Sequence, residues 1–543
     1  MPDKVSLVSS MAPQDATMFW LSARTRNDLF LLYSFADTGA PTETLRTAVA
    51  ARSARIPDLR VRLRETPGDL GYPSWVSCEY SADQFVEHPL PRADWAAVEA
   101  ALGDLLATGV DATLHPWKLH VFRGVAGAPM RDADDELATV VVLQMSHALA
   151  DGRRAAAIAR ELFSEEGRGE SSGLGVAAAR AADVRAVGAE AARTARADST
   201  GLAADENGAG FRVRLESGRA AVGRVAGQVA GARNRSGATD GVGRTRASTV
   251  FEFAANWFAG IRDSSMAGTV WGAARIPAGM VRTAVRGYRA YRAQMELAEL
   301  TAAGKAPPPG PGFAPSAVNK FGAEGVIRHR ARMIVCEAEE LRVPGWTITV
   351  VVLTAVSVAL AEYLATRGEP VSRLGAQVPM ALPGASLSHN NYRSLGVELF
   401  IEEPDLRLQA DRIAAALAER RLRARHPLLS AQDRVTDVTP APILRRDVDR
   451  YPIDNVPDSI AGHTVVSSVY RGPADLTFGG GPVRCTGGFP ALGAVMHLTH
   501  GVHGLGDTVT VSIHADAAVV DLDSYADLLR TALREVAATL ADR

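Results

Sequence analysis

Cysteine is the first residue type that this sequence has little of. Its three cysteines, Cys78, Cys336 and Cys485, are too few and too scattered for a disulfide framework or a zinc site, so we expect a reducing, intracellular setting. The formal net charge is only -2, so the chain lacks the excess of positive charge that is typical of proteins that bind nucleic acid. With 543 residues and a hydrophobic fraction of 47%, the chain can still build a large core and more than one domain.

Long hydrophobic runs are scarce as well. The first four residues lack the basic start and apolar run of a signal peptide. A charge-free stretch of nearly spanning length occurs at 343–361, but it contains Pro344, Gly345 and several hydroxyl residues, and Glu362 follows at once. We therefore favour a buried core helix over a membrane span for this stretch.

Three regions of the chain differ in composition. Residues 1–165 and 311–543 mix strand-like and helix-like patterns, whereas 166–310 is rich in alanine, glycine and arginine and ends in a stiff proline-glycine connector at 307–312. We predict an α/β protein in which two mixed-sheet halves, 1–165 and 311–543, are joined by a long helical insert, 166–310.

Short apolar or β-branched runs predict strands, and periodic apolar faces predict helices. The expected strands are 29–35, 139–145, 373–379, 465–470, 494–499 and 508–515. The expected helices are 42–53, 152–163, 347–363, 405–423, 522–540 and, in the insert, 177–197 and 276–300. A short segment between the strand at 139–145 and the helix at 152–163 carries the residues of most chemical interest.

That segment reads Ser146-His147-Ala148-Leu149-Ala150-Asp151-Gly152. A histidine at a strand end projects from a rigid scaffold, and its neutral imidazole can accept a proton from a hydroxyl near neutral pH. Asp151 can orient the turn through its carboxylate, and Gly152 allows backbone geometry that other residues disfavour. His147 is thus a candidate general base; the alternative from these residues alone is a core histidine with satisfied hydrogen bonds.

The surrounding sequence resembles a known family. The stretch 114–122, the strand at 139–145 and the segment 146–152 are together similar to the bacterial wax ester synthase/diacylglycerol acyltransferase family, which belongs to the CoA-dependent acyltransferases with an HHxxxDG motif. Further similar segments are 12–19, 314–319, 328–331, 466–473 and 509–540. The resemblance covers most of both halves and implies that each is chloramphenicol-acetyltransferase-like. For 166–310 it offers only that a long connector is usual there.

The chain departs from the family pattern at three places. The first histidine of the motif is Ser146 here, whereas the second, which the family uses as the base, is retained as His147. The Asn-Asp pair at the start of a core helix appears as Thr349-Val350, and the Asn of the Asn-Val-x-Gly-Pro segment is Ser468. These departures bear on rate and on the class of acceptor more than on the fold.

Carried over position by position, the resemblance implies a role for each motif residue. His147 would deprotonate the acceptor hydroxyl, and Asp151 would be structural rather than a proton carrier. Ser146 can donate a hydrogen bond near the thioester oxygen or cap the helix that follows, and we favour the cap. Ser146 and Gly152 are both expected to border the bound substrate.

Four residues outside the motif are also expected at the substrate site. Pro116 and Trp117 would lie near the acyl or acceptor channel, with plain core packing as the alternative for Trp117. Asn319 lies in the segment that resembles the opening of the family's second half, and Asn391 resembles its Gly-Asn turn.

Two other patterns suggest a metal site and a phosphate loop but lack the residues that such sites need. His497, His500 and His503 lie close together, but successive side chains of a strand alternate between faces and no acidic or thiol ligand joins them at a recognisable spacing, so we expect no metal site. The run 479–482, Gly-Gly-Gly-Pro, lacks the Lys-Ser/Thr of a phosphate loop and predicts a turn.

The expected helix at 276–300 has two stripes. The apolar stripe contains Val281, Ala284, Val285, Tyr288, Tyr291 and Met295. The basic stripe contains Arg282, Arg286 and Arg289. A basic amphipathic helix of this kind can lie on an anionic membrane or lipid-droplet surface, and the alternative is a helix packed on the protein body with its arginine face in solvent.

The resemblance implies an acyl-CoA-dependent O-acyltransferase that makes triacylglycerol or wax ester. Its partners would be acyl-CoA, a hydrophobic hydroxyl acceptor and a lipid surface, with no cofactor, metal or nucleic acid. The expected location is cytoplasmic, peripherally attached to the inner face of the membrane or to lipid droplets. An acyltransferase acting on another hydroxyl, such as that of a glycolipid or polyketide, and a lipid-binding paralogue without turnover remain the alternatives.

Overall fold

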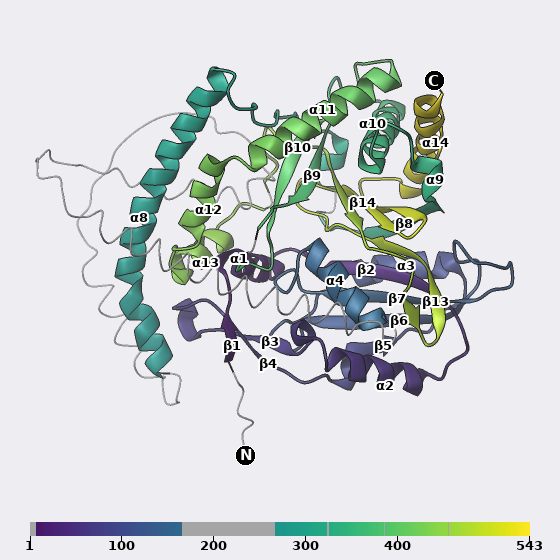
Figure 1. Ribbon diagram of the computed structural model, residues 1–543, viewed down its shortest axis with the longest axis horizontal. Coiled ribbons are helices and arrows are strands. Elements are labelled where there is room, and N and C mark those ends of the chain that lie inside the picture. The colour runs from purple at the N-terminus through teal and green to yellow at the C-terminus, as the bar shows by residue number, and fades with distance from the viewer. Residues whose placement is uncertain (1–6, 165–265, 323–324, 385, 454, 543) are drawn as a thin grey trace, which may run out of the picture.

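The computed structural model describes residues 7–164, 266–322, 325–384, 386–453 and 455–542, with only the backbone described at 266–274. Most of the predicted insert, including the expected helix at 177–197, lies outside these residues. Two six-stranded sheets form the body of the protein, one largely from each half of the chain (Figure 1). The predicted α/β class with two mixed-sheet halves is confirmed.

The first sheet has the strand order β12-β13-β2-β7-β6-β5. Its strands are β2 (Leu29–Ala36), β5 (Phe85–Glu87), β6 (Trp117–Val125), β7 (Ala138–Met145), β12 (Thr477–Phe478) and β13 (Gly481–Gly488). Strand β7 lies between β2 and β6, pairs antiparallel with both, and is buried along its whole length. A β-branched run such as Val140-Val141-Val142 suits this position because both faces of the strand are covered.

The second sheet has the order β10-β9-β11-β14-β15-β8. Its strands are β8 (His329–Glu337), β9 (Gly375–Ala381), β10 (Tyr392–Glu398), β11 (Thr464–Tyr470), β14 (Leu498–Leu505) and β15 (Thr508–Asp516). Strands β9, β11 and β14 run parallel, so their carboxyl ends meet at one edge of the sheet. The loop at 382–391, which joins β9 to the antiparallel β10, therefore lies at this edge.

Helices cover the sheets, and a small sheet of order β1-β4-β3 adjoins the first half. Its strands are β1 (Leu7–Ser10), β3 (Val61–Arg64) and β4 (Ser74–Ser77). The helices of the first half are α1 (Pro13–Ser22), α2 (Thr42–Ser53), α3 (Trp95–Leu106) and α4 (Gly152–Phe163). Those of the second half are α9 (Ala338–Leu341), α10 (Ile348–Thr366), α11 (Leu406–Ala424), α12 (Ser430–Thr436), α13 (Ala441–Asp449) and α14 (Leu522–Ala541).

The two halves exchange structure at their junction. Strands β12 and β13 come from the second half of the sequence, yet β13 pairs with β2 of the first sheet, and Figure 1 shows the yellow β13 beside the blue and purple strands. Helix α3 of the first half packs against β8 of the second; a Cβ on Gly103 would lie 2.6 Å from the His329 carbonyl oxygen, so this close approach requires glycine. The boundaries of the predicted halves remain a prediction.

Most of the charge-free stretch at 343–361 belongs to helix α10. By length and composition it is the one helix of the described chain that could cross a membrane, but 67% of its most apolar window is buried inside the protein. It packs against α11 and α14, and Val351, Leu353 and Leu360 have no exposed surface. The burial supports the interpretation of this stretch as a core helix.

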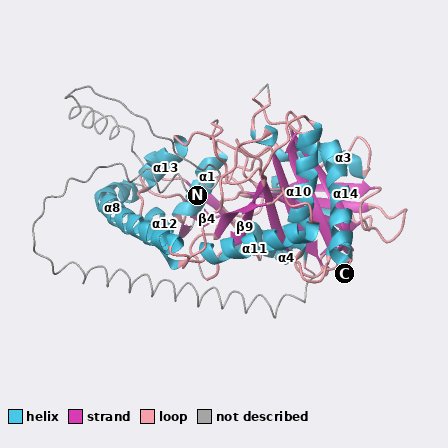
Figure 2. Cartoon of the chain, turned by 90° about the horizontal axis from the view of Figure 1, so that it is seen from above, coloured by secondary structure: helices cyan, strands magenta, loops and turns pink. Residues whose placement is uncertain are grey.

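The described end of the insert is one long helix, α8 (Met266–Ala302), which lies at one side of the molecule beside α12 and α13 (Figures 1 and 2). It is longer than the expected helix at 276–300 and contains Pro277. Small residues make its contact with the body, since Ala290 and Ala293 pack against Ala431 and Val435 of α12.

Most of the other expected elements agree with the structure to within two or three residues. The strand expected at 494–499 is wrong, because β14 begins only at Leu498 and the preceding residues form a turn with an isolated bridge between Gly493 and Met496. Strands β6 and β13 were not expected: β6 carries a histidine and charged residues, and the glycine-rich β13 has little β propensity of its own.

Candidate active site

His147 lies just beyond the carboxyl end of β7, in the turn that leads to α4. The turn is tied to its neighbours by main-chain hydrogen bonds: the Ser146 amide donates to the Pro116 carbonyl (2.8 Å), and the Leu149 amide donates to the Ser146 carbonyl (2.9 Å). Because Pro116 immediately precedes β6, the histidine is fixed to two adjacent strands of the first sheet.

Asp151 is the N-cap of α4. One carboxylate oxygen accepts a hydrogen bond from the Arg154 amide (2.9 Å), and the other accepts one from the Asn391 amide (3.3 Å). The Asp151 amide in turn donates to the His389 carbonyl (3.1 Å). The aspartate therefore ties the His147 turn to the loop at 382–391 of the second half, a geometry that suits the predicted structural role.

Burial lowers the pKa of His147 from its ordinary value, and the residue's own backbone together with nearby Asn390, Asp151 and Asp15 offsets only part of this effect. The imidazole is therefore neutral at neutral pH, although the residue as a whole is only partly buried. Its Nδ1 is buried without a hydrogen bond of normal geometry. Among the described residues nothing hydrogen-bonds to Nε2, which leaves this nitrogen available to a substrate hydroxyl.

The loop of the second half contributes a residue that the sequence did not single out. The Asn390 side-chain amide donates to the His147 carbonyl (2.7 Å) and to Oδ1 of Asp15 on α1 (2.9 Å). Asp15 lies within the segment 12–19 that resembles the family's opening, but no spacing pattern connects it to residues more than 370 positions away. Only the docking of the two halves brings the three residues together.

Tyr392, at the start of β10, closes another side of the imidazole. The two ring centroids are 6.1 Å apart, and burial raises the pKa of Tyr392 to about 12, so its phenol stays neutral. In the loop before β10, His389 stacks on Trp75 of β4, with the ring centroids 5.9 Å apart. The neutral Tyr392 ring beside His147 adds no charge that would favour the imidazolium.

Two expectations about the motif are corrected by the geometry. Ser146 does not cap α4, because Asp151 does; the Ser146 hydroxyl instead accepts a hydrogen bond from the Ala148 amide (3.3 Å). Gly152 does not have a positive φ, and a Cβ there would meet Val469 of β11 at an ordinary 3.7 Å. Glycine at this position is therefore explained by neither backbone strain nor crowding, although the contact shows how closely β11 approaches the motif.

The other expected site residues divide into two groups. Asn391 is at the motif through its bond to Asp151, and its side chain donates to the Leu382 carbonyl (3.3 Å). Asn319 is not: it is fully buried and donates to the His463 and Val495 carbonyls (2.9 and 2.8 Å). His463 precedes β11, whereas Gly152 meets Val469 near the end of that strand, so Asn319 lies at the opposite end of β11 from the motif.

Trp117 is a core residue in this structure. It has no exposed surface, its indole N–H donates to the Leu59 carbonyl (3.0 Å), and its ring stacks with Tyr80 at 6.0 Å. Pro116 is buried beside it. These contacts favour the packing interpretation of Trp117, and a place for either residue along a substrate channel stays a prediction.

Two of the positions that depart from the family pattern meet each other. The Thr349 hydroxyl at the start of α10 donates to the Ser468 hydroxyl of β11 (3.0 Å). Ser468 is exposed and directly precedes Val469, which faces Gly152. The two departures therefore form one contact at the rim of the motif rather than two independent changes.

Two of the three clustered histidines have separate partners. His497 bonds Asp516 (3.0 Å), and His500 bonds Tyr525 and Thr464 (2.9 Å each). No group of three or more potential metal ligands occurs among the described residues. Within the run at 479–482, the first two glycines form the expected turn between β12 and β13, whereas Gly481 and Pro482 already belong to β13.

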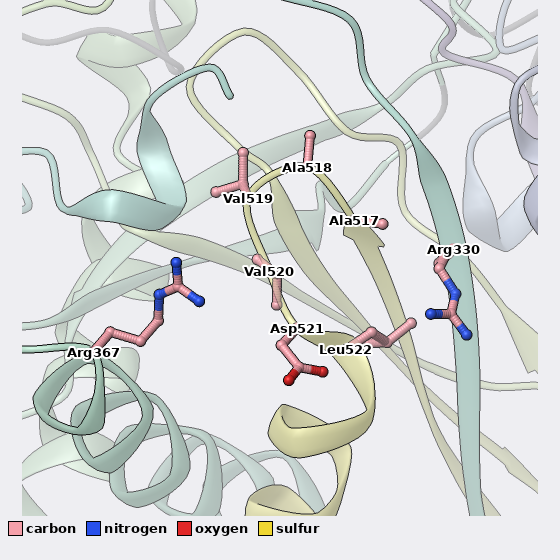
Figure 3. Close-up of a pocket in the computed structure, with 8 residues that line it drawn as sticks. All are labelled: Arg330, Arg367, Ala517, Ala518, Val519, Val520, Asp521 and Leu522. Carbon is pink, nitrogen blue, oxygen red and sulfur yellow. The ribbon is translucent and has the colours of Figure 1, made fainter. Parts of the chain in front are cut away.

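A surface pocket of about 310 Å³ lies elsewhere on the second half. Figure 3 shows Arg330 and Arg367 on its two sides, with Asp521 at the start of α14 between them. The residues at 517–522 follow β15, whose end lies at the start of β14 because these strands are antiparallel. The pocket is thus at the opposite end of the sheet from the 382–391 loop and forms no part of the His147 site.

Comparison with known proteins places this geometry in a fold. No protein-family model and no curated protein matches the chain. Among solved structures, it is similar to the wax ester synthase/diacylglycerol acyltransferase from Marinobacter aquaeolei VT8, at 16% identity and a TM-score of 0.53, over 98% of this chain and 100% of that one. It also matches the starter condensation domain of rhizomide synthetase in complex with C8-CoA (12% identity, 98% and 95% covered, TM-score 0.49). A third match is the first condensation domain of the CDA synthetase, at 13% identity and a TM-score of 0.48, over 98% of this chain and 97% of that one.

The two-lobed acyltransferase fold of the Marinobacter enzyme is therefore the fold of this chain. The resemblance first visible around 114–152 is confirmed at this level and extends over nearly the whole chain. At 16% identity the likeness concerns the fold, and the chemistry has to be argued from the residues themselves.

Proposed function

We propose that this protein is an acyl-CoA-dependent O-acyltransferase that transfers a long-chain acyl group to diacylglycerol or a long-chain alcohol, forming triacylglycerol or wax ester. The observation that carries the proposal is the state of His147, an imidazole that burial keeps neutral at the junction of the two halves, with Nε2 unengaged by the described residues. The likeness of the fold to the Marinobacter enzyme supports it.

In the proposed reaction the acceptor supplies the nucleophile, so no protein nucleophile is needed. Nε2 of His147 takes the hydroxyl proton as the oxygen attacks the thioester carbonyl, forming the new C–O bond. Collapse of the tetrahedral intermediate breaks the C–S bond, and the imidazolium returns its proton to the departing thiolate. The products are the ester and free CoA, and acyl-CoA is consumed as a substrate without a cofactor or metal.

We further propose the residue boundaries 1–165, 166–310 and 311–543 for the N-terminal half, the insert and the C-terminal half. Asp151 would hold the turn, and Ser146, Gly152 and Asn391 would border the substrate. A cytoplasmic enzyme attached peripherally to the inner face of a membrane, or to lipid droplets, agrees with an acceptor that is nearly insoluble in water.

Two alternative functions share this fold and site. Ser146 in place of the first motif histidine, and the Thr349–Ser468 contact at the rim, favour a reshaped acceptor site, such as one for a glycolipid or polyketide hydroxyl. The same departures favour a lipid-binding paralogue without turnover. An assay of acyl transfer to several different acceptors separates these alternatives.

The test is an assay of purified protein with labelled palmitoyl-CoA against diacylglycerol, a long-chain alcohol and a glycolipid, with labelled ester and free CoA both measured. His147→Ala should lower turnover by about a hundredfold or more, because it removes the base. His329→Ala is the matched control, since that partly buried histidine pairs with His514 far from the motif and should keep its activity. Near-normal turnover by a folded His147→Ala protein would exclude the mechanism.

Helix α8 provides the surface through which we propose that the enzyme binds anionic lipid. Its stripe of large apolar side chains faces away from the body, with Val281, Val285 and Tyr288 exposed by 64%, 47% and 55%. Such a stripe, flanked by Arg282 and with Arg292 in its midst, offers apolar area and positive charge to an anionic surface.

One part of the expected basic stripe is wrong. Arg286 does not belong to this outward face, because its guanidinium donates to the Arg434 carbonyl of α12 (3.0 Å) and so holds α8 to the body. The packing face consists instead of small residues such as Ala290 and Ala293, which leaves the large apolar side chains outside. Packing on the body and contact with lipid are therefore compatible, because they use opposite faces of one helix.

A further inference from the structure

Asp15 is a buried carboxylate whose surroundings are unusual. It is only 1% exposed, and in the described part of the chain no arginine, lysine or histidine lies within ion-pair distance of it. Four donors from a single loop satisfy it: the Ser388 hydroxyl (2.7 Å), the His389 amide (2.8 Å), and the Asn390 amide and side chain (3.0 and 2.9 Å). Burying a carboxylate without a countercharge is costly, so these bonds hold the loop in one conformation.

The orientation of the Asn390 amide follows from its partners. Its Nδ2 faces two acceptors, the His147 carbonyl and Asp15, so the amide cannot be flipped without placing its oxygen against both. The remaining atom, Oδ1, is buried without a hydrogen bond of normal geometry, and so is Nδ1 of His147. The His147 backbone and the Asn390 side chain both act to raise the pKa of the ring. Oδ1 of Asn390 is thus a buried acceptor without a partner, in a side chain that contacts at 2.7 Å the residue whose Nδ1 also lacks one.

We propose that Asp15 and Asn390 are positioning residues for His147: Asp15 holds the 388–390 loop, and Oδ1 of Asn390 keeps the imidazole proton on Nδ1, so that Nε2 faces the acceptor hydroxyl as a free base. The catalytic part of this proposal rests on the acyltransferase function proposed above. A base of this kind works only in one tautomer, and the partner of the other ring nitrogen selects that tautomer. An amide oxygen selects the tautomer without adding a further negative charge beside the ring.

The arrangement also makes the site depend on the docking of the two halves. Asp15 comes from α1 and His147 from the end of β7, both in the first half, whereas Asn390 comes from the loop before β10 in the second half. The chain of contacts thus crosses from one half to the other and back. Separation of the halves would remove the partner of Nδ1 and leave both tautomers open.

The titration of His147 can report this contact, because few other charged or titratable groups face the ring. Asp151 lies in its own turn, Asp15 on α1, and the neutral Tyr392 on β10. Exchanging the two partners, Asp15→Asn together with Asn390→Asp, keeps one carboxylate and one amide but places the carboxylate against Nδ1. The pKa of His147 should then rise, because an adjacent anion favours the imidazolium.

Four variants test the proposal in the full-length protein: Asn390→Ala, Asp15→Asn, the exchange variant, and Asn455→Ala as the matched control. Asn455→Ala makes the same amide-to-methyl change at an exposed asparagine outside the 388–390 loop, ahead of the start of β11. The direct measurement is ¹⁵N NMR of histidine-labelled protein, with the His147 signals assigned from His147→Ala. It reports the tautomer and titration of the ring without any turnover.

We expect wild type and Asn455→Ala to show a neutral His147 with its proton on Nδ1. Asn390→Ala should show mixed tautomers and lose roughly tenfold to a hundredfold in kcat with little change in KM for acyl-CoA. The exchange variant should titrate at higher pH than wild type and recover part of the kcat that Asp15→Asn loses. Melting temperatures identify any variant that fails to fold.

An unchanged tautomer in folded Asn390→Ala, or an unmoved His147 titration in the exchange variant, would overturn the proposed contact. If the NMR results are as expected but wild type transfers no acyl group, the positioning stands and the proposed function fails. If wild type turns over and the NMR results are contrary, the function stands and the positioning fails.

Discussion

Removing the exposed side chains of α8 should weaken binding to anionic vesicles in two separable ways. Val285 and Tyr288 are 47% and 55% exposed, so about half of each side chain remains to be buried in lipid. Full burial of a large apolar side chain contributes about 1.5–3 kcal/mol, which leaves about 1 kcal/mol for each residue here. Val285→Ser with Tyr288→Ser should therefore weaken binding by about 2 kcal/mol, or roughly 30-fold, at any salt concentration.

The arginines on the same face of α8 allow a second set of variants to be tested. Each arginine near an anionic surface contributes about 1 kcal/mol, so Arg282→Gln with Arg292→Gln should also cost roughly 30-fold at low salt. This loss should shrink as salt is raised, because exposed charges are screened beyond about 10 Å at 0.1 M. The matched control is Arg421→Gln with Arg534→Gln, which changes net charge equally on the exposed surfaces of α11 and α14.

Sedimentation of full-length protein with vesicles containing phosphatidylserine, at low and high salt, measures both arms. Turnover with a short, soluble acceptor should stay unchanged in every variant, because His147 lies in a different segment. If both α8 variants bind vesicles as tightly as wild type does, the helix is only packed on the body. Equal weakening by the control pair would instead indicate net charge without a dedicated surface.

Four further predictions concern the motif and the junction. Asp151→Asn should lower melting temperature and activity together, since it weakens an N-cap contribution of about 1 kcal/mol and the bond to the second half; lost activity at an unchanged melting temperature would contradict the structural role. Because burial lowers the pKa of His147, the base stays deprotonated below its ordinary range, so the acid limb of kcat/KM should have its midpoint below pH 6.5; a midpoint above that value would refute the assignment. Ser146→His restores the family pattern and should hold or raise turnover if the serine is neutral drift, but lower it with the native acceptor if the site has been reshaped; an identical rate and acceptor profile would show that this position decides neither. Gly103→Val should cost about 1–3 kcal/mol in thermal unfolding, because its side chain meets the β8 backbone; unchanged stability would argue against that close packing.

The parts of the fold that local pattern could predict are those in which one segment decides its own structure. β7 was expected because a continuous β-branched run suits a strand covered on both faces, and α4 and α14 were expected because their apolar residues recur at helical spacing. The exchange of β13 into the first sheet could not be predicted, because its register with β2 depends on partners more than 440 residues away.

The sequence by itself determined the position of the candidate base. His147 follows a strand and precedes a helix, and both elements are specified by their own residues, between Ala138 and Phe163. For the same reason the apolar stripe of α8 could be predicted, since periodicity depends only on neighbouring residues. Which side of that helix meets the body could not, because contact with α12 is decided by small residues that carry little hydrophobic signal.

Tertiary structure alone decided what surrounds the base. Asp15 and Asn390 meet at 2.9 Å although they are 375 residues apart, and adjacent Asn391, the more family-like of the two asparagines, bonds Asp151 instead. Asn319 has the residue type expected at the site but lies at the far end of β11. The physical reason is that hydrogen bonds and burial act between groups that folding brings within a few ångströms, and sequence distance carries no information about which groups those are.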